Sequence, residues 1–454
     1  MKNGNQYSSE IQEQIFRFVE LLKVSAKTKD LKKGASLHTE ILKKRLLEKS
    51  PYIASILISM YTKCGEVAKA HQVLEELPIR NVFSWSALIS GYVQQGQGHE
   101  ALNCFERMQK EGFAPDAISF VCALKACANM GSIDKGTQIH DEIISRGLLG
   151  KDIMLGNALV DMYTKCGVLA KALQVLEELP IRNTISWNVL IAGYAERDQG
   201  REALSCYKQM RSEGLSPDEV TLLFVLKACA SAGDIVKGKQ IHDEIASRGL
   251  FEKDIVLGNV LVDMYSKCGD LAEAEMVFNE LPNRSIVSWN AVISGYSQRG
   301  RNREALNCFS QMQSEGLSPD IVTFIYIVKA CGDMGALGRG HSIHDLIMLG
   351  ALEEDNIIGS SLIDMYAQCG SLNEARKVFD ALPQPDIVLW GSIIGAYAEQ
   401  GLIGPAWELF EKMQEYGLKP NSVIYLSLLK ACCNVGGLEY GKAIHAQIIQ
   451  VGFE

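Results

Sequence analysis

The stretch SWNVLIAGY, residues 186–194, decides the fold because it recurs in near-copy along the chain. The other copies are SWSALISGY (84–92), SWNAVISGY (288–296) and LWGSIIGAY (389–397). Their tryptophans lie 102, 102 and 101 residues apart. A long period of this kind predicts a repeat array rather than a set of separate globular domains. The frame is kept while the residue after each tryptophan varies: Ser86, Asn188, Asn290 and Gly391.

Each period divides again into three shorter units. Their lengths are 31, 35 and 36 residues in the stretches 153–183, 184–218 and 219–254. Sliding this frame along the chain predicts thirteen units, from about residue 15 to residue 454, after an N-terminal extension of residues 1–14. Strand-like alternation of apolar and polar residues does not compete with the helical pattern, so the sequence predicts an all-α fold.

The unit 184–218 shows why each unit should form two helices. Apolar residues from Trp187 to Tyr194 follow the i, i+3, i+4, i+7 spacing of one helix face, and a second apolar face begins after the break AERDQG. Gly214 and Pro217 are placed to end the second helix. The resulting architecture is an α-solenoid of helix-turn-helix units, each burying its apolar faces against its neighbours.

Composition limits the possible functions. The chain has 47% hydrophobic and 22% charged residues and a formal net charge of −9. An acidic chain is poorly suited to bind nucleic acid by bulk charge, although a narrow basic stripe remains compatible with it. No apolar run is long enough to predict a membrane span. The N-terminus resembles neither a secretory signal nor a transit peptide, so either the mature chain starts here or a targeting segment is left off.

Cysteine and histidine recur with the long period and suggest metal chemistry at first sight. Equivalent cysteines lie a full period apart, too far for disulfides, and no CxxC occurs. His140 and His242 begin HDE sequences, half of a zinc deaminase signature, but the PCxxC half is absent. We therefore expect buried thiols, packing or capping histidines, no metal or cofactor, and no enzyme activity.

The alternation of unit lengths resembles the PLS class of pentatricopeptide repeat proteins, whose P, L and S units have about 35, 35 and 31 residues. The motifs that carry this resemblance are SWNVLIAGY in P units, VLKACA…GKQIH in L units and NALVDMYTKCG…LEELP in S units. The units are then L 15–50, S 51–81, P 82–116, L 117–152, S 153–183, P 184–218, L 219–254, S 255–285, P 286–320, L 321–355, S 356–386, P 387–421 and L 422–454.

This resemblance implies a right-handed α-solenoid superhelix that binds single-stranded RNA in a mitochondrion or chloroplast. Such proteins most often select cytidines for C-to-U editing, while other RNA processing stays open. The chain shows no C-terminal DYW-type deaminase, so the resemblance implies one of two cases. Either a deaminase or editing-complex protein is supplied in trans, in contact with the L units, or a C-terminal catalytic extension is left off. The alternative is a tetratricopeptide-like protein–protein interaction scaffold; it would not need polar pairs repeated at 31- and 35-residue spacing.

In this family, the variable residue of each P or S unit reads one base together with the last residue of the unit. A competing interpretation is that these side chains merely start helices. The pairs and favoured bases are Ser55 with Asn81 for adenine, Ser86 with Asp116 for guanine, Asn157 with Asn183 for cytosine over uracil, Asn188 with Asp218 for uracil, Asn259 with Ser285 for cytosine, Asn290 with Asp320 for uracil, and Ser360 with Asp386 for guanine.

Two kinds of unit depart from the pattern. Gly391, paired with Asn421, has no side chain to reach a base, so its base is left unassigned. The L units carry Val121, Leu223, Ile325 and Leu426 at the reading position. These side chains cannot hydrogen-bond a base, which favours a spacer or partner-binding role. The implied RNA reads 5′-AGNCUNCUNGN-3′, where N is any base.

Basic and apolar residues near the reading positions predict further RNA contacts. Lys63, Lys165 and Lys267 follow Ser55, Asn157 and Asn259 by eight residues, which places them near the same helix face. They are candidates for phosphate contacts, with solvated surface lysines as the alternative. Apolar residues just before the polar reader are candidates to sandwich the bases: Ile185, Val256 and Val287.

Overall fold

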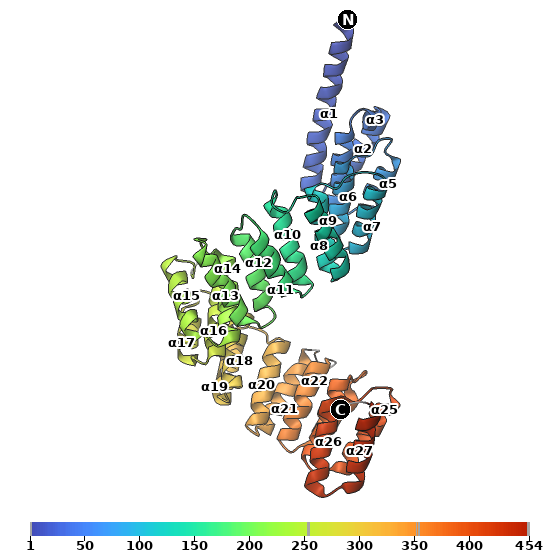
Figure 1. Cartoon of the computed structure of the whole chain (residues 1–454). Coiled ribbons are helices and arrows are strands. Elements are labelled where there is room, and N and C mark those ends of the chain that lie inside the picture. The colour runs from blue at the N-terminus through green and yellow to red at the C-terminus, as the bar shows by residue number, and fades with distance from the viewer. Residues whose placement is uncertain (1, 252–254, 351, 353–354, 452–454) are drawn as a thin grey trace. The chain divides into compact units, whose positions relative to one another are not determined.

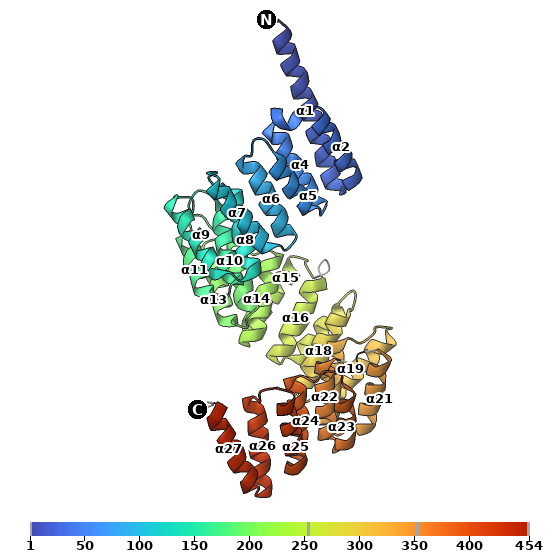
Figure 2. The same ribbon diagram turned by 90° about the vertical axis from the view of Figure 1, so that its right-hand side faces the viewer.

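The computed structural model describes residues 2–251, 255–350, 352 and 355–451. The chain divides into two compact units, Met1–Ala228 and Cys229–Glu454, and the division falls inside helix α14 (Glu219–Ala232). In the described residues every regular element is a helix (Figures 1 and 2). The predicted repeat ends at residues 254 and 454 lie outside the described part.

The first unit, Met1–Ala228, stacks its helices in two layers. Neighbouring helices of the first layer contact each other in chain order, and each packs on the second-layer helix that follows it. The first layer contains α4 (Pro51–Lys63), α6 (Val82–Gln94), α8 (Ala117–Met130), α10 (Ile153–Lys165) and α12 (Thr184–Ala195). The second layer contains α5 (Val67–Glu76), α7 (Gly98–Lys110), α9 (Ile133–Ser145), α11 (Leu169–Glu178) and α13 (Gly200–Ser212). At the N-terminus, α1 (Lys2–Thr28), α2 (Leu31–Lys43) and α3 (Leu46–Lys49) pack on α4.

The second unit, Cys229–Glu454, repeats this arrangement. Its first layer contains α16 (Ile255–Cys268), α18 (Ile286–Gln298), α20 (Ile321–Asp333), α22 (Asn356–Gln368), α24 (Ile387–Glu399) and α26 (Ser422–Val435). Its second layer contains α15 (Ile235–Ser247), α17 (Leu271–Glu280), α19 (Asn302–Ser314), α21 (Leu337–Leu349), α23 (Leu372–Ala381), α25 (Ile403–Glu415) and α27 (Leu438–Val451).

The predicted all-α solenoid of stacked helix pairs is confirmed within each unit. The break AERDQG separates α12 from α13, and Gly214 has a φ of +79°, the left-handed conformation in which glycine ends helices without strain. At the N-terminus, helix α1 begins at Lys2 and runs through the N-terminal extension into the first predicted unit.

The repeated tryptophans fix the first-layer helices in the core. Trp85, Trp187 and Trp289 are fully buried. The indole Nε1 of Trp187 donates a hydrogen bond to Glu213 Oε2 at 2.9 Å, so its one polar atom is satisfied. Because the tryptophan is held on both its apolar and its polar side, the residue that follows it is turned by about 100° in a fixed direction.

First-layer helices approach each other closely where a glycine faces a small β-branched or polar residue. A Cβ added at Gly91 would lie 2.2 Å from Thr62 Cγ2 and 2.6 Å from Thr62 Cβ. Gly193 faces Thr164 in the same way, with 2.1 Å to Cγ2 and 3.5 Å to Cβ. At the equivalent place between α22 and α24, the pair is Ala367 and Ala396, both buried. The size of one partner therefore compensates for the size of the other.

The recurring histidines pack between repeats, which is one of the two roles, packing or capping, that the sequence predicts. The ring Nδ1 of His140 lies 2.9 Å from the Tyr163 hydroxyl, linking α9 to the next first-layer helix α10. Equivalent pairs are His38 with Tyr61, His242 with Tyr265, and His344 with Tyr366. All thirteen cysteines are free thiols. No group of three or more His, Cys, Asp or Glu side chains in the described residues could hold a metal ion, and no helix there could cross a membrane.

Candidate functional site

The two members of each predicted reading pair have different positions in the fold. Asn188 is the fifth residue of α12, whereas its partner Asp218 precedes α14 and accepts a hydrogen bond from Thr221 N at 2.8 Å. The last residue of a predicted unit is thus the cap of the following helix. The interpretation that the variable residues themselves start helices is wrong for Asn188, which lies in the second turn.

Asn188 and Asp218 contact each other directly. The amide Nδ2 of Asn188 donates to Asp218 Oδ1 at 2.9 Å and to Oδ2 at 3.1 Å. The hydroxyl of Thr221 donates to Asn188 Oδ1 at 2.6 Å, which fixes which side of the amide faces the carboxylate. Asn188 is only 8% exposed, while Asp218 is exposed. The pair therefore offers a recessed amide beside an accessible carboxylate.

The second unit contains the same constellation at Asn290 and Asp320. Asn290 Nδ2 donates to the two carboxylate oxygens at 2.9 and 3.1 Å, and Thr323 donates to Asn290 Oδ1 at 2.6 Å. Burial raises the pKa of Asp320, but hydrogen bonds from Thr323 and Asn290 outweigh it and hold the pKa below its usual value. Burial also raises the pKa of Asp218, but hydrogen bonds from Thr221 and Asn188 outweigh it and hold that pKa below its usual value. Both carboxylates are therefore held in the charged, hydrogen-bond-accepting form.

Serine at the reading position gives a different arrangement. Ser86 Oγ donates to the Val82 carbonyl at 2.8 Å and lies 3.2 Å from Asp116 Oδ1 and 2.8 Å from Ser119 Oγ. Without an amide, Asp116 lacks the two-point contact that Asn188 gives to Asp218. Ser55 Oγ likewise lies 3.4 Å from Asn81 Oδ1. The serine and asparagine pairs thus present different hydrogen-bonding groups at equivalent positions.

In the stretches 153–183 and 255–285, the two members of each pair are more loosely joined. Asn157 Oδ1 accepts from Ser186 Oγ at 2.6 Å, and the same hydroxyl lies 2.9 Å from Asn183 Oδ1, so a serine bridges the two predicted readers. Asn259 Nδ2 lies 3.4 Å from Ser285 Oγ, and its buried Oδ1 has no hydrogen-bond partner. A buried acceptor without a hydrogen-bond partner is uncommon in folded proteins.

The last two pairs contact neighbouring backbone. Ser360 Oγ donates to the Ile357 carbonyl at 2.9 Å, and Asp386 accepts from Leu389 N at 2.9 Å. Asn421 Oδ1 accepts from Ile424 N at 3.0 Å as the cap of α26. Gly391 has no side chain that could pair with Asn421.

Apolar side chains three residues before each reading position are exposed. Only Ile185, Val256 and Val287 were named from the sequence, but the structure extends the set to every first-layer helix from α4 onward. Their exposed fractions range from 46% to 63%. The set is Tyr52, Phe83, Ile118, Met154, Ile185 and Val220 in the first unit, and Val256, Val287, Val322, Ile357, Val388 and Val423 in the second. The constant three-residue offset was the sequence signal that identifies all of them.

A pocket brings these groups together in the first unit. It has a volume of about 540 Å³, and Ile185 and Val220 line it together with the pair Asn188 and Asp218. Lys165, a predicted phosphate ligand, lines the same pocket. Two apolar side chains thus lie beside one polar pair and one ammonium group. The predicted reader, flanking residue and lysine of neighbouring repeats converge on a single site.

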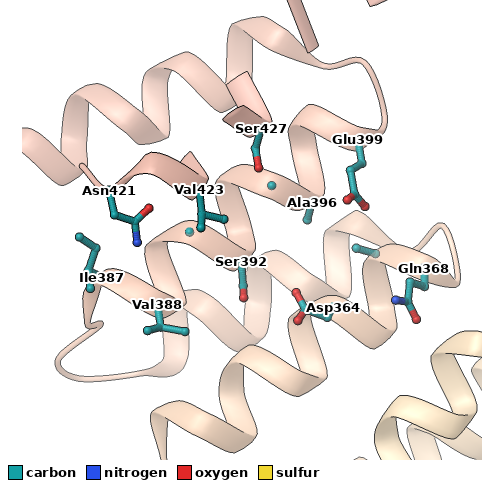
Figure 3. A pocket seen from close by; sticks show the side chains of 13 residues that line it. Asp364, Gln368, Ile387, Val388, Ser392, Ala396, Glu399, Asn421, Val423 and Ser427 are labelled. Atoms are coloured by element: carbon teal, nitrogen blue, oxygen red, sulfur yellow. The ribbon is translucent and has the colours of Figure 1, made fainter. Parts of the chain in front are cut away.

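A second pocket, of about 460 Å³, lies at the equivalent position of the second unit (Figure 3). Val388 and Val423 correspond to Ile185 and Val220, and Asn421 corresponds to Asp218. The same site therefore recurs in both compact units, two long periods apart.

The predicted phosphate lysines are partly neutralised by aspartates that sequence reasoning missed. Lys165 Nζ lies 3.0 Å from Asp161 Oδ2, and Lys267 Nζ lies 2.9 Å from Asp263 Oδ2. Both aspartates precede their lysine by four residues, the spacing of helix ion pairs, so the signal was present. Lys63 is exposed, and the residue four positions before it is Ser59. Phosphate binding by these lysines stays a prediction.

Comparison with known families identifies the repeats. The model described as PPR repeat family matches residues 80–129, 182–231, 284–333 and 385–434. The model described as PPR repeat matches residues 52–82, 157–183, 259–286 and 360–384, and together these matches cover more than half of the chain. The chain belongs to the pentatricopeptide repeat family.

Curated pentatricopeptide repeat proteins of Arabidopsis thaliana align with nearly the whole chain. A chloroplastic one is 34% identical over 427 residues, which are 94% of this chain and 52% of the relative. A mitochondrial one is 35% identical over 423 residues, 93% of this chain and 41% of the relative. A second chloroplastic one is 32% identical over 429 residues, 94% of this chain and 68% of the relative. The chain thus spans between about two fifths and two thirds of the length of these relatives.

Solved pentatricopeptide repeat structures share the fold. The crystal structure of the pentatricopeptide repeat protein PPR10 in complex with an 18-nt psaJ RNA element matches with a TM-score of 0.72 at 20% identity, covering 94% of this chain and 65% of that chain. The crystal structure of PPR10 from maize matches with a TM-score of 0.59 at 20% identity, covering 99% and 72%. At this identity, the likeness establishes the fold alone.

Proposed function

We propose that the chain binds single-stranded RNA along its first-layer helices and reads about one base per repeat. The observation that carries this proposal is the pocket at Asn188, where two exposed apolar side chains flank a polar pair. Apolar flanks suit the two faces of a base, and the polar pair suits its hydrogen-bonding edge. The likeness to PPR10, which was crystallised with an RNA element, supports the same ligand class.

The proposed base order is 5′-AGNCUNCUNGN-3′, from the pairs assigned above. Their different contacts support different base choices: the Asn188 amide is bonded to the Asp218 carboxylate, whereas Ser86 leaves Asp116 without an amide donor. Hydrogen-bonding patterns that differ in this way favour different base edges. Lys63, Lys165 and Lys267 are proposed to contact phosphates.

We propose a more specific biological role from the alternation of unit lengths, which resembles that of the PLS class. In this role the chain is a specificity factor for organellar C-to-U editing or other RNA processing, in a mitochondrion or chloroplast. Curated relatives with those locations support the organellar assignment. The deaminase or editing-complex partner would contact the repeats that carry Val121, Leu223, Ile325 and Leu426.

Binding to paired and unpaired RNA tests the proposed function. We expect an unstructured oligomer with the proposed order to bind at least about tenfold more tightly than the same bases placed in a hairpin stem, because bases must be unstacked to enter the pockets. Fluorescence anisotropy with both labelled RNAs measures the ratio. Equal affinity for the two forms, or no binding to either, would refute the proposal.

Positions opposite the apolar readers should tolerate any base. Val121 and its three counterparts offer no hydrogen bond, so they distinguish base edges only weakly. We expect all four bases at the third position of the oligomer to bind within about threefold of one another. A base scan by anisotropy measures this, and a tenfold preference at that position would contradict the spacer assignment.

A further inference from the structure

The repeat at 387–421 lacks a reading side chain, yet several polar side chains line its pocket. A Cβ added at Gly391 would make an ordinary van der Waals contact with Ile424 Cγ1, at 3.5 Å, so no neighbouring side chain overlaps the reading position. Asn421 uses its Oδ1 to cap α26, and its amide group points into the pocket (Figure 3). Another residue must therefore supply hydrogen-bond acceptors if this pocket takes a base.

The carboxylate of Asp364 carries two acceptor oxygens. Asp364 extends from α22 into the same pocket, and its carboxylate and Ser392 of α24 point toward each other (Figure 3). In the equivalent pocket of the first unit, the corresponding Asp161 is bound to Lys165. Gln368 replaces that lysine here, so Asp364 has lost the helical cation that holds its counterpart.

Two further replacements make this pocket more polar than its counterpart. Ser392 and Ser427 line it where Val189 and Phe224 line the first. Asp364 is partly exposed, but burial of its carboxyl group raises its pKa, and the nearby Glu399 raises it further. The Ser392 hydrogen bond acts in the opposite direction, and the resulting pKa is about 6. Near neutral pH the carboxylate is charged without a neighbouring cation, so it gains most from a ligand that donates hydrogen bonds.

We propose that Asp364 is the base-reading residue of this pocket and that the base is guanine; this inference rests on the proposed RNA-binding function. Guanine carries two adjacent donors, N1–H and N2–H, which match the two oxygens of one carboxylate. Its neighbouring O6 can accept from the Asn421 amide. Adenine, cytosine and uracil lack the two adjacent donors, and the absent Gly391 side chain leaves room for a purine.

The test compares four RNAs that differ only at the last position of 5′-AGNCUNCUNGN-3′. We expect the unmodified chain to prefer guanine there by about tenfold, the typical discrimination of a two-point contact. Asp364→Asn should reduce that preference to within about twofold, because an amide offers one acceptor and one donor. Its uracil preference at the Asn188 position should not change, and neither preference should change in the control Asp380→Asn, which lies on α23 beside Arg376.

A second variant tests the same pocket while leaving Asp364 unchanged. In Gly391→Asn the added Cβ overlaps no neighbouring atom. The variant recreates the Asn–Asn combination of Asn157 and Asn183, so its preference should move from guanine to cytosine. If the unmodified chain binds RNA without preferring guanine at the last position, or if Asp364→Asn keeps that preference, the inference is wrong while the proposed function stands. If no RNA binds, the proposed function itself fails.

Discussion

The variant Asn188→Ser should move the base preference of one repeat from uracil to guanine. It removes the amide that donates to both oxygens of Asp218, and it leaves the serine–aspartate combination found at Ser86 and Asp116. Binding to RNA with uracil at that position should weaken by about 1–3 kcal/mol, the usual cost of one mismatched position. Binding should recover when that uracil alone is changed to guanine.

Two proteins measured against two RNAs make the comparison independent of stability. Asn188 lies in the second turn of α12, where serine is accepted in the equivalent helix α6, so folding should change little. Anisotropy titrations give four affinities, and the coupling between protein and base is their double difference. Equal weakening on both RNAs would mean that Asn188 has only a structural role.

The variant Gly91→Ala should strongly destabilise the repeat stack. The added methyl group would overlap Thr62 at both Cγ2 and Cβ, and a side-chain rotation cannot move Cβ away. Overpacking of a buried contact costs about 1–3 kcal/mol. At Gly193 only Thr164 Cγ2 is overlapped, which rotation can relieve, so Gly193→Ala should cost less. Urea unfolding followed by circular dichroism measures both.

The double variant Thr62→Ala/Gly91→Ala is the matched control. It reproduces Ala367 and Ala396, which this chain already uses at the equivalent contact. We expect it to recover most of the lost stability, with a coupling energy above about 0.5 kcal/mol. Additive effects of the two substitutions would show that the residues do not compensate for each other.

The sequence predicted those features that depend on periodicity. Repeat length follows from the spacing between copies of the tryptophan motif, and the helix pairs and buried tryptophans follow from apolar spacing within a single unit. The sequence also located the groups that meet at Asn188, because a fixed offset along each helix puts them on one face. It left open which base, if any, enters the pocket at Gly391.

Features that depend on contacts between repeats were not predicted. Thr221 orients the Asn188 amide from 33 residues away, and Thr164 of α10 faces Gly193 of the neighbouring first-layer helix α12. Neither contact can be recognised from the spacing of residues within one unit, because each side chain is an ordinary helix residue there. The Asp161–Lys165 pair was visible as an i, i+4 spacing, but its effect on phosphate binding depends on the groove around it.

The shared role of the last residue in each repeat limits how such a chain can be reprogrammed. Asn183 caps α12 and accepts from Ser186, and through that serine it is joined to Asn157 of the preceding first-layer helix, α10. Replacing Asn183 with a residue that favours another base would also alter how helix α12 begins. To change the RNA target, the residue inside the helix, such as Asn157, should therefore be substituted first. A repeat that is moved into another protein should include the first turn of the helix that follows it.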